Sequence, residues 1–222
     1  MLGRDLSFGS LDNAAVLTTL NLEEFTPTGQ YIVAVEVKNI RSWIYRSTAE
    51  LYQLLYKAAQ LQLDHPTHRF VPVFVCRRAQ YMTNQMAEAL GFYVISTKRQ
   101  YVPASVAGRE LDEVNTELGY DLEPAPASPP PALVKHFTAT LQSVAERTAS
   151  RWSVTAQALV ENFKALRNDR LSNRDREELT HELLDIAADI HDNHRGTITN
   201  YGDLGTHQGV TTASVLEDDV PF

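Results

Sequence analysis

The hydrophobic positions of the chain follow two different periods, one on each side of a proline-rich segment at residues 123–131. Before this segment, four short apolar runs rich in β-branched residues are typical of strands: 11–20, 31–37, 70–75 and 92–95. Two stretches between these runs, 47–61 and 80–90, carry apolar residues every three or four positions, as amphipathic helices do. The order predicts a mixed α/β sheet flanked by helices within residues 1–122.

Local signals refine these elements. Ser47-Thr48-Ala49-Glu50 has the spacing of a capping box at the start of the first helix. Gly91 is placed to end the second helix in the left-handed conformation. Pro72 lies within the third apolar run, where its missing donor suits the start of a strand or the edge of a sheet.

After the proline-rich segment, which we expect to be a linker, the period is helical throughout. Apolar stripes predict three helices, with Ser153 able to cap the second and Ser172 opening a cap-like sequence before the third. Residues 132–195 are therefore expected to form a small all-α region, as a helical domain or an arm. Residues 196–222 lack periodicity and are expected to form an irregular acidic tail.

Composition limits the class of protein. Of 222 residues, 43% are hydrophobic and 22% charged, which is ordinary for a globular protein, and no apolar run is long enough to span a membrane. The start of the chain does not resemble a secretory signal, and the single cysteine, Cys76, fits a reducing compartment, so we expect a cytoplasmic protein. The net charge of −8 argues against coating nucleic acid by bulk charge. Residues 1–120 carry only −1 of it, which leaves room for a local basic groove.

Glu36 and Lys38 end the most apolar of the predicted strands. Residues two apart in a strand point to the same side, so the two charged groups project together. A divalent metal would explain the carboxylate, because Mg²⁺ binds one or two carboxylates and keeps several waters. Asp12, at the start of the preceding strand, would face Glu36 if the two strands pair as a hairpin.

These residues resemble the PD-(D/E)xK nuclease superfamily, and most closely its Mrr-like and nuclease-related-domain branches. The resemblance rests on Asp12 and on Glu36-Val37-Lys38-Asn39, and it covers about residues 8–100. It implies a restriction-endonuclease-like mixed sheet and Mg²⁺-dependent hydrolysis of DNA, with Mn²⁺ as a possible substitute. It also implies that Asp12, Glu36 and the Val37 carbonyl hold the metal and that Lys38 contacts the attacking water.

The family often carries a glutamine on the helix that follows, and here both Gln53 and Gln60 are available. It also normally has a helix before the acidic strand, whereas only a short segment precedes Asp12.

Basic side chains near the predicted strand ends are candidates for binding DNA phosphates: Arg41, Arg46, Arg77, Arg78, Lys98 and Arg99. Trp43 and Tyr45 could stack on bases or pack at the sheet edge. If the third and fourth strands run parallel, the pairs Arg77-Arg78 and Lys98-Arg99 lie at one end of the sheet. Solvated strand ends are an equal explanation for these charges.

The last residues form a possible docking motif for a protein partner. Asp218, Asp219, Pro221 and Phe222 resemble the acidic tip of bacterial single-stranded DNA-binding proteins, and a chance acidic tail is the alternative. Several histidines and acids lie at 181–194, where a solvated polar helix face explains them better than a metal site.

Two functions therefore follow as hypotheses. The first is a metal-dependent DNA endonuclease that forms a homodimer through its helical region. The second is a non-catalytic nuclease-like module that binds nucleic acid or acts as a scaffold for DNA-repair proteins.

Overall fold

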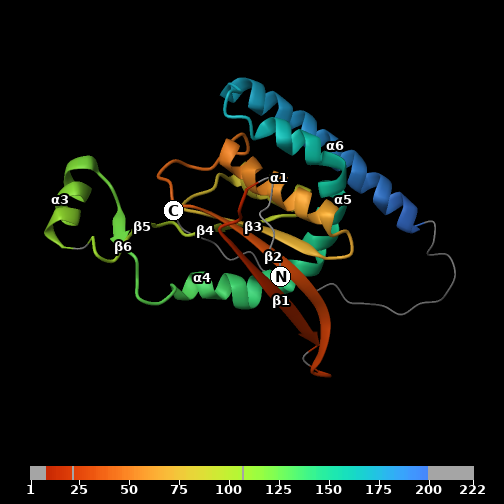
Figure 1. Cartoon of the computed structure of the whole chain (residues 1–222), viewed down its shortest axis with the longest axis horizontal. Helices are drawn as coiled ribbons and strands as arrows, with labels where there is room; N and C mark the ends of the chain where they lie inside the picture. Colours follow the sequence, from red (N-terminus) through yellow and green to blue (C-terminus); the bar gives the residue numbers. More distant parts are fainter. Residues whose placement is uncertain (1–8, 22, 107, 200–222) are drawn as a thin grey trace.

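The protein is a mixed α/β structure built on a four-stranded mixed sheet, with helices on both faces (Figure 1). The computed structural model describes residues 9–21, 23–106 and 108–199. Within these residues, no helix is both long and apolar enough to cross a membrane.

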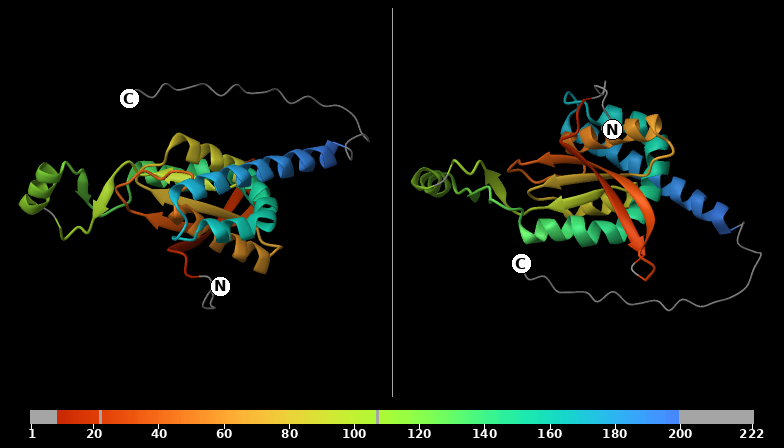
Figure 2. Two further views of the ribbon diagram at one scale, coloured as in Figure 1. Left: turned by 90° about the horizontal axis from the view of Figure 1, so that it is seen from above. Right: turned by 60° about the horizontal axis from the view of Figure 1, so that its bottom comes forward.

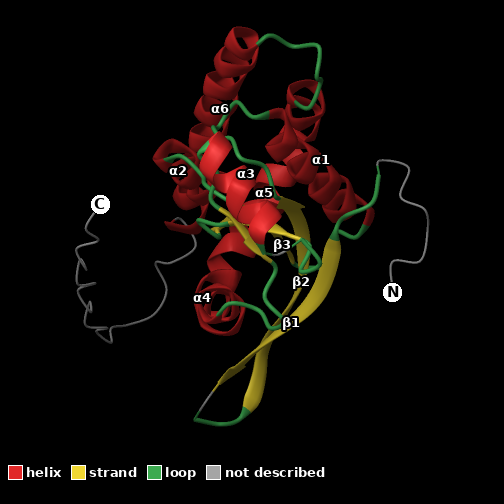
Figure 3. Ribbon diagram, turned by 90° about the vertical axis from the view of Figure 1, so that its left-hand side faces the viewer, coloured by secondary structure: helices red, strands yellow, loops and turns green. Residues whose placement is uncertain are grey.

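The strand order of the sheet is β1-β2-β3-β4. β1 (Asn13–Asn21) pairs antiparallel with β2 (Thr26–Lys38), as the predicted hairpin requires. β3 (Phe70–Cys76) and β4 (Tyr93–Ser96) continue the sheet in parallel, so the condition for Arg77-Arg78 and Lys98-Arg99 to lie at one end of the sheet is met. The β1–β2 hairpin extends well beyond the helices that cover the rest of the sheet (Figure 3).

The expectation that Pro72 marks a strand start or a sheet edge is wrong. β3 is a central strand, and Pro72 is its third residue, opposite Ala34 of β2. Pairing with β4 begins only at Val73. A proline is therefore tolerated in this central strand because it precedes the part that is paired on both sides.

Two helices lie between the parallel strands in sequence, α1 (Ala49–Asp64) and α2 (Tyr81–Leu90). The predicted capping box does not form at α1, because the Thr48 hydroxyl accepts a 2.8 Å hydrogen bond from the Tyr45 backbone N–H instead. Gly91 ends α2 with φ +82°, as predicted.

The helices after the proline-rich segment differ from the prediction. α4 (Pro131–Lys135), the π-helical turn η1 (His136–Thr140) and α5 (Leu141–Leu166) follow one another without a break, so two expected helices are one. Ser153 lies inside α5 and bonds to the Ser150 carbonyl, so it is not a cap. α6 (Asn173–Thr199) begins as predicted, with the Ser172 hydroxyl accepting the Asp175 backbone N–H at 3.1 Å.

These helices share the hydrophobic core with the sheet. On one face, Leu141, Ala145 and Ala149 of α5 pack against alternate valines of β2 and β3. On the other, the second half of α5 lies with α1, α2 and α6 (Figure 2). Trp152 and Phe163 of α5 are buried in this second cluster. Residues 132–195, expected as a helical domain or arm, thus complete the core of the preceding residues.

A small β-α-β unit between β4 and the proline-rich segment has no counterpart in the prediction. β5 (Gln100–Val102) pairs in parallel with β6 (Leu122–Pro124), and α3 (Arg109–Leu118) connects them. This unit, residues 100–124, projects from the sheet at the left of Figure 1. We call it the protrusion.

Candidate functional site

Glu36 lies near the carboxyl end of β2, on the face of the sheet that α1 covers. Its alternation with the buried Val35 turns its side chain toward that helix, and only 2% of Glu36 is exposed. An ionised carboxylate at this depth is stable only with partners of opposite charge.

Two lysines supply these partners. The Lys38 Nζ lies 3.0 Å from Glu36 Oε1, and the Lys57 Nζ lies 3.0 Å from Oε2 and 3.2 Å from Oε1. Lys38 comes from the same strand and Lys57 from α1, so the carboxylate is held between the sheet and the helix. Both ammonium groups are themselves largely shielded from solvent, which strengthens the attraction.

Asp12 lies immediately before β1, the strand next to β2, beside this cluster. β1 pairs with β2 so that Asn13 is opposite Val35, which brings Asp12 next to Glu36. The Asp12 Oδ2 accepts a 2.7 Å hydrogen bond from the Val37 backbone N–H. The structure therefore brings Asp12 close to Glu36 and Lys38, although 24 positions separate Asp12 from Glu36 in the sequence.

Lys57 is the member of this cluster that the sequence did not single out. A signal for it was present, because Gln53, Lys57 and Gln60 are spaced by four and three residues and share one face of α1. Of these three side chains, Lys57 makes the contact to Glu36.

The four side chains have a net charge of zero, since two carboxylates face two ammonium groups. Such a cluster can do two things. It can remain a buried ion network. Alternatively, its carboxylates can bind a divalent cation and its ammonium groups can bind a phosphate, in place of their contacts with each other. Asp12 is the exposed member, so the cluster is open to solvent on the β1 side.

The donor set fits a hard cation such as Mg²⁺. The carboxylates of Glu36 and of Asp12, just before β1, are oxygen ligands, as is the Val37 carbonyl between Glu36 and Lys38. In the part of the chain that the structure describes, no three histidine, cysteine or acidic side chains gather as metal ligands, and the cluster at Glu36 contributes only two carboxylates. A cation here would share Glu36 with the two lysines and rely on waters for its remaining ligands.

Most of the basic residues proposed for DNA contact the protrusion. Arg77 is buried, forms an ion pair with Asp121 and donates to the Arg41 carbonyl, while Arg78 lies 3.4 Å from the second Asp121 oxygen. The Arg77 guanidinium holds the pKa of the Asp121 carboxyl below its usual range. Arg99 pairs with Glu123.

Arg41 stacks on the Tyr120 ring at 3.9 Å and donates to the Gly119 carbonyl at 3.2 Å. These arginines lie at the same end of the sheet as Glu36 and fix the protrusion there.

The remaining candidates differ in their surroundings. Arg46 donates to Glu177 of α6 at 2.6 Å and contacts His181, so it joins the loop before α1 to that helix. Lys98 is exposed, with φ +59°. Trp43 and Tyr45 are half exposed, and Arg78 lies over the Trp43 ring at 5.8 Å.

Cys76 is buried at the end of β3, and burial raises the pKa of its thiol to about 11. The thiol is thus protonated at neutral pH, which makes Cys76 a packing residue and not a nucleophile.

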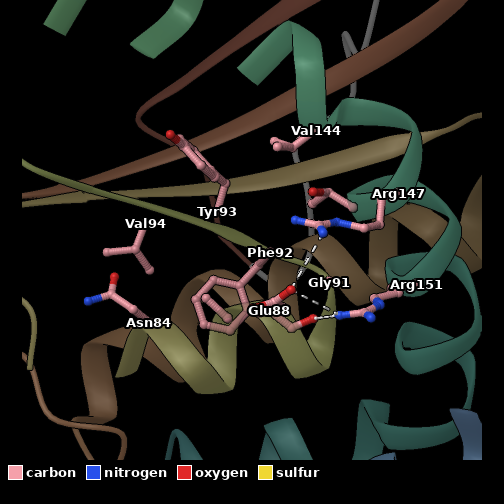
Figure 4. Close-up of a pocket in the computed structure, with 11 residues that line it drawn as sticks. Asn84, Glu88, Gly91, Phe92, Tyr93, Val94, Val144, Arg147 and Arg151 are labelled. Atoms are coloured by element: carbon pink, nitrogen blue, oxygen red, sulfur yellow. Dashed lines mark hydrogen bonds and ion pairs between the residues drawn. The ribbon is translucent and has the colours of Figure 1, made fainter. Parts of the chain in front are cut away.

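A pocket lies between α2 and α5. The charged side chains that line it are Glu88, Arg147 and Arg151 (Figure 4). Arg151 donates to the Glu88 carbonyl at 2.6 Å, and the Glu88 carboxylate lies 3.6 Å from Arg147. These contacts join the two helices. The possible docking residues Asp218, Asp219, Pro221 and Phe222 lie outside the described residues.

Comparison with family models, with curated proteins and with solved structures finds no match to this chain.

Proposed function

We propose that the protein is a metal-dependent nuclease that hydrolyses phosphodiester bonds in DNA, with its active site at Asp12, Glu36, Lys38 and Lys57. The observation that carries the proposal is the buried Glu36 carboxylate, held by two lysines and flanked by Asp12 at the start of the neighbouring strand's hairpin arm, where it accepts the Val37 N–H. A sheet has little structural need for four charged groups at this point, because apolar residues of similar volume stabilise a core at least as well.

The topology supports a restriction-endonuclease-like fold. β1, which directly follows Asp12, pairs antiparallel with the strand that ends in Glu36-Val37-Lys38, and a helix then leads to a parallel neighbour. The described residues contain no helix before β1, and the first half of α5 covers one face of the sheet.

Each residue has a distinct role in the proposal. Asp12, Glu36 and the Val37 carbonyl would hold Mg²⁺, which when bound activates a water and neutralises charge on the phosphate. Lys38, the more exposed of the two lysines, would position that water or meet the developing charge. Lys57 would orient Glu36 from α1, so it is a positioning residue.

DNA would approach the carboxyl end of β2, where the protrusion and the arginines that hold it border the site. Lys98 and the half-exposed Trp43 and Tyr45 lie in this region as possible phosphate and base contacts. The preference for DNA over RNA rests on the family resemblance.

Plasmid cleavage tests the proposal. Purified protein is incubated with supercoiled, single-stranded and branched DNA in Mg²⁺ or Mn²⁺, and wild type is compared with Lys38→Ala and Glu36→Ala. Wild type should cleave at least one substrate, and both variants should be slower by about 100-fold or more. Glu24→Ala, at the exposed hairpin tip, is a matched control that should cleave as wild type does. No cleavage of any substrate by folded wild type would contradict the proposal.

A second candidate function is a non-catalytic nuclease-like module that binds nucleic acid or holds DNA-repair proteins together. The observation that favours it is the pairing of both Glu36 oxygens with lysines, which leaves the charge balanced without a cation. DNA binding by wild type without cleavage in either metal would support this function.

A further inference from the structure

We propose that β1 is a self-association surface, on which a second copy of this chain adds its own β1 in antiparallel fashion. The sheet order places β1 at an edge, where one side of its backbone is not used by β2. An edge strand of nine residues is a template for pairing with another chain, and proteins usually block such edges with charges, proline or a short length.

β1, with the sequence NAAVLTTLN, is not short and has no charge or proline, and its one register shift with β2, between Thr19 and Leu20, lies near its end. The protein carries a net charge of −8, which opposes the association of two copies in general. An uncharged edge is a place where two copies can meet without like charges.

The sequence of β1 is also complementary to itself. In an antiparallel pair centred on Leu17, all nine residues find a partner, with Asn13 opposite Asn21 and Ala14 opposite Leu20. The small residue of one copy thereby faces the large residue of the other. Cross-strand pairs of this kind are the unit by which sheets are stabilised.

The surroundings of β1 favour a second copy as the occupant. On the face toward α1, Val16 and Leu20 are 45% and 52% exposed, which is high for apolar residues of a strand. The same face borders an open cavity of about 860 Å³, lined by Ala14, Val16, His65 and Arg69. In the proposed pair, Leu20 of the second copy would lie beside Ala14 at the rim of this cavity.

The helical region was predicted as the dimer contact, but most of its apolar residues pack in the core of the same chain. The stripe of α5 is buried in both core clusters, and Leu183 and Ala187 of α6 are buried against α5 and its neighbours. The β1 edge is therefore a better surface for a second copy.

Sedimentation equilibrium of the full-length protein tests this inference. Wild type should reach twice the monomer mass. In the variant Val16→Lys/Thr18→Lys, each lysine would face a lysine of the other copy, so the dimer should be lost. Val16→Glu/Thr18→Glu should be monomeric for the same reason, and an equal mixture of the two variants should regain the dimer mass.

Two controls separate this surface from others. Val114→Lys/Leu118→Lys changes two exposed residues of α3 and should leave the dimer intact. Leu17→Cys, on the two-fold axis, should form a disulfide-linked dimer on oxidation, whereas Phe25→Cys at the exposed hairpin tip should not. The buried Cys76 should not contribute a crosslink.

Several results would overturn the inference: a monomeric wild type, a lysine variant that keeps the dimer mass, or a mixture of the two variants that stays monomeric. These outcomes are independent of DNA cleavage, so the two proposals can fail separately.

Discussion

Two lysines from different elements, Lys38 of β2 and Lys57 of α1, stabilise the ionised form of the buried Glu36 carboxylate. Removal of one partner from a buried ion pair leaves an uncompensated charge, whereas a carboxylate with two partners still has one after a single loss. Substitution of Glu36, which has two charged partners, should therefore lower the free energy of unfolding more than substitution of Lys38 or Lys57, which have one each.

We expect Glu36→Gln to lower the free energy of unfolding by about 3 kcal/mol, because it leaves Lys38 and Lys57 facing each other without an acid. Lys57→Met should cost about 1 kcal/mol, since Lys38 still pairs with Glu36. Urea unfolding measures both. Equal losses for the two variants would contradict this account of the cluster.

At this scale the sequence predicted three of the four residues in the cluster. Asp12, Glu36 and Lys38 follow from strand alternation and hairpin pairing, which are local rules. Lys57 could not be selected, because the rotation of α1 over the sheet decides which of its polar residues reaches Glu36. That rotation depends on packing contacts far apart in the sequence.

The approach of α2 and α5 depends on Gly91, where α2 ends and the chain turns toward β4. A Cβ at Gly91 would lie against the backbone nitrogen of Trp152, 2.8 Å from the Thr148 carbonyl oxygen. Gly119 ends α3 in a similar left-handed conformation, but a Cβ there would meet nothing within 4 Å.

Gly91→Ala should therefore lower the free energy of unfolding by about 3 kcal/mol, from backbone strain and overpacking together. Gly119→Ala has the strain alone and should cost about 1 kcal/mol. Thermal or urea unfolding of the two variants measures the difference. A Gly91→Ala protein as stable as Gly119→Ala would show that the contact between α2 and α5 is loose.

Glu146 joins α5 to the sheet. Its carboxylate accepts a 2.6 Å hydrogen bond from the buried Tyr31 hydroxyl and pairs with Arg69. The Tyr31 hydrogen bond is the main reason that the pKa of Glu146 lies below its ordinary 4.5, and Arg69 adds to it.

A lowered pKa in the folded protein means that this contact stabilises the fold above pH of about 4.5 and is lost as pH falls through the lowered value. Because Glu146 is exposed, Glu146→Gln should cost only about 0.5 kcal/mol at pH 7. The difference from wild type should disappear at the acid end of a pH series of urea unfolding curves. A difference that persists there would contradict this role for the ionised carboxylate.

At the scale of elements, the strands and their pairing could be predicted better than the helices. Short apolar runs rich in β-branched residues located all four strands of the main sheet, and the hairpin between β1 and β2 was considered as a condition for Asp12 to face Glu36. The break expected at Ser153 was wrong because a serine can also bond back to a helical carbonyl within a helix. β5, α3 and β6 were missed because α3 has a single buried residue, Leu111, and its sequence carries little core signal.

At the scale of the whole molecule, the described residues form two hydrophobic core clusters, one on each face of the sheet. Proline residues at 123–131 suggested two separate parts, yet α5 packs on both faces of the sheet that precedes them. The proline content correctly indicated an extended segment, but it could not indicate that the helices after this segment pack back on the sheet. Those long-range contacts depend on the shape of both surfaces.

In the proposed β1-paired dimer, the two Asp12 residues would lie about 34 Å apart along the strands, at five residues from the axis in each copy. This spacing is close to one turn of B-DNA, so two candidate sites could reach one duplex. The pairing would thus connect the edge of the sheet with the proposed cleavage.

The central claim is that Asp12 and Glu36 together bind the metal that supports DNA cleavage. Asp12→Asn tests it most directly, because Asp12 is exposed and an asparagine oxygen can still accept the Val37 backbone N–H. The measurement is the rate of Mg²⁺-dependent plasmid cleavage by wild type and Asp12→Asn under identical conditions. We predict cleavage by wild type and a loss of about 100-fold or more in the variant. Equal rates in the two proteins, or no cleavage by wild type, would contradict the claim.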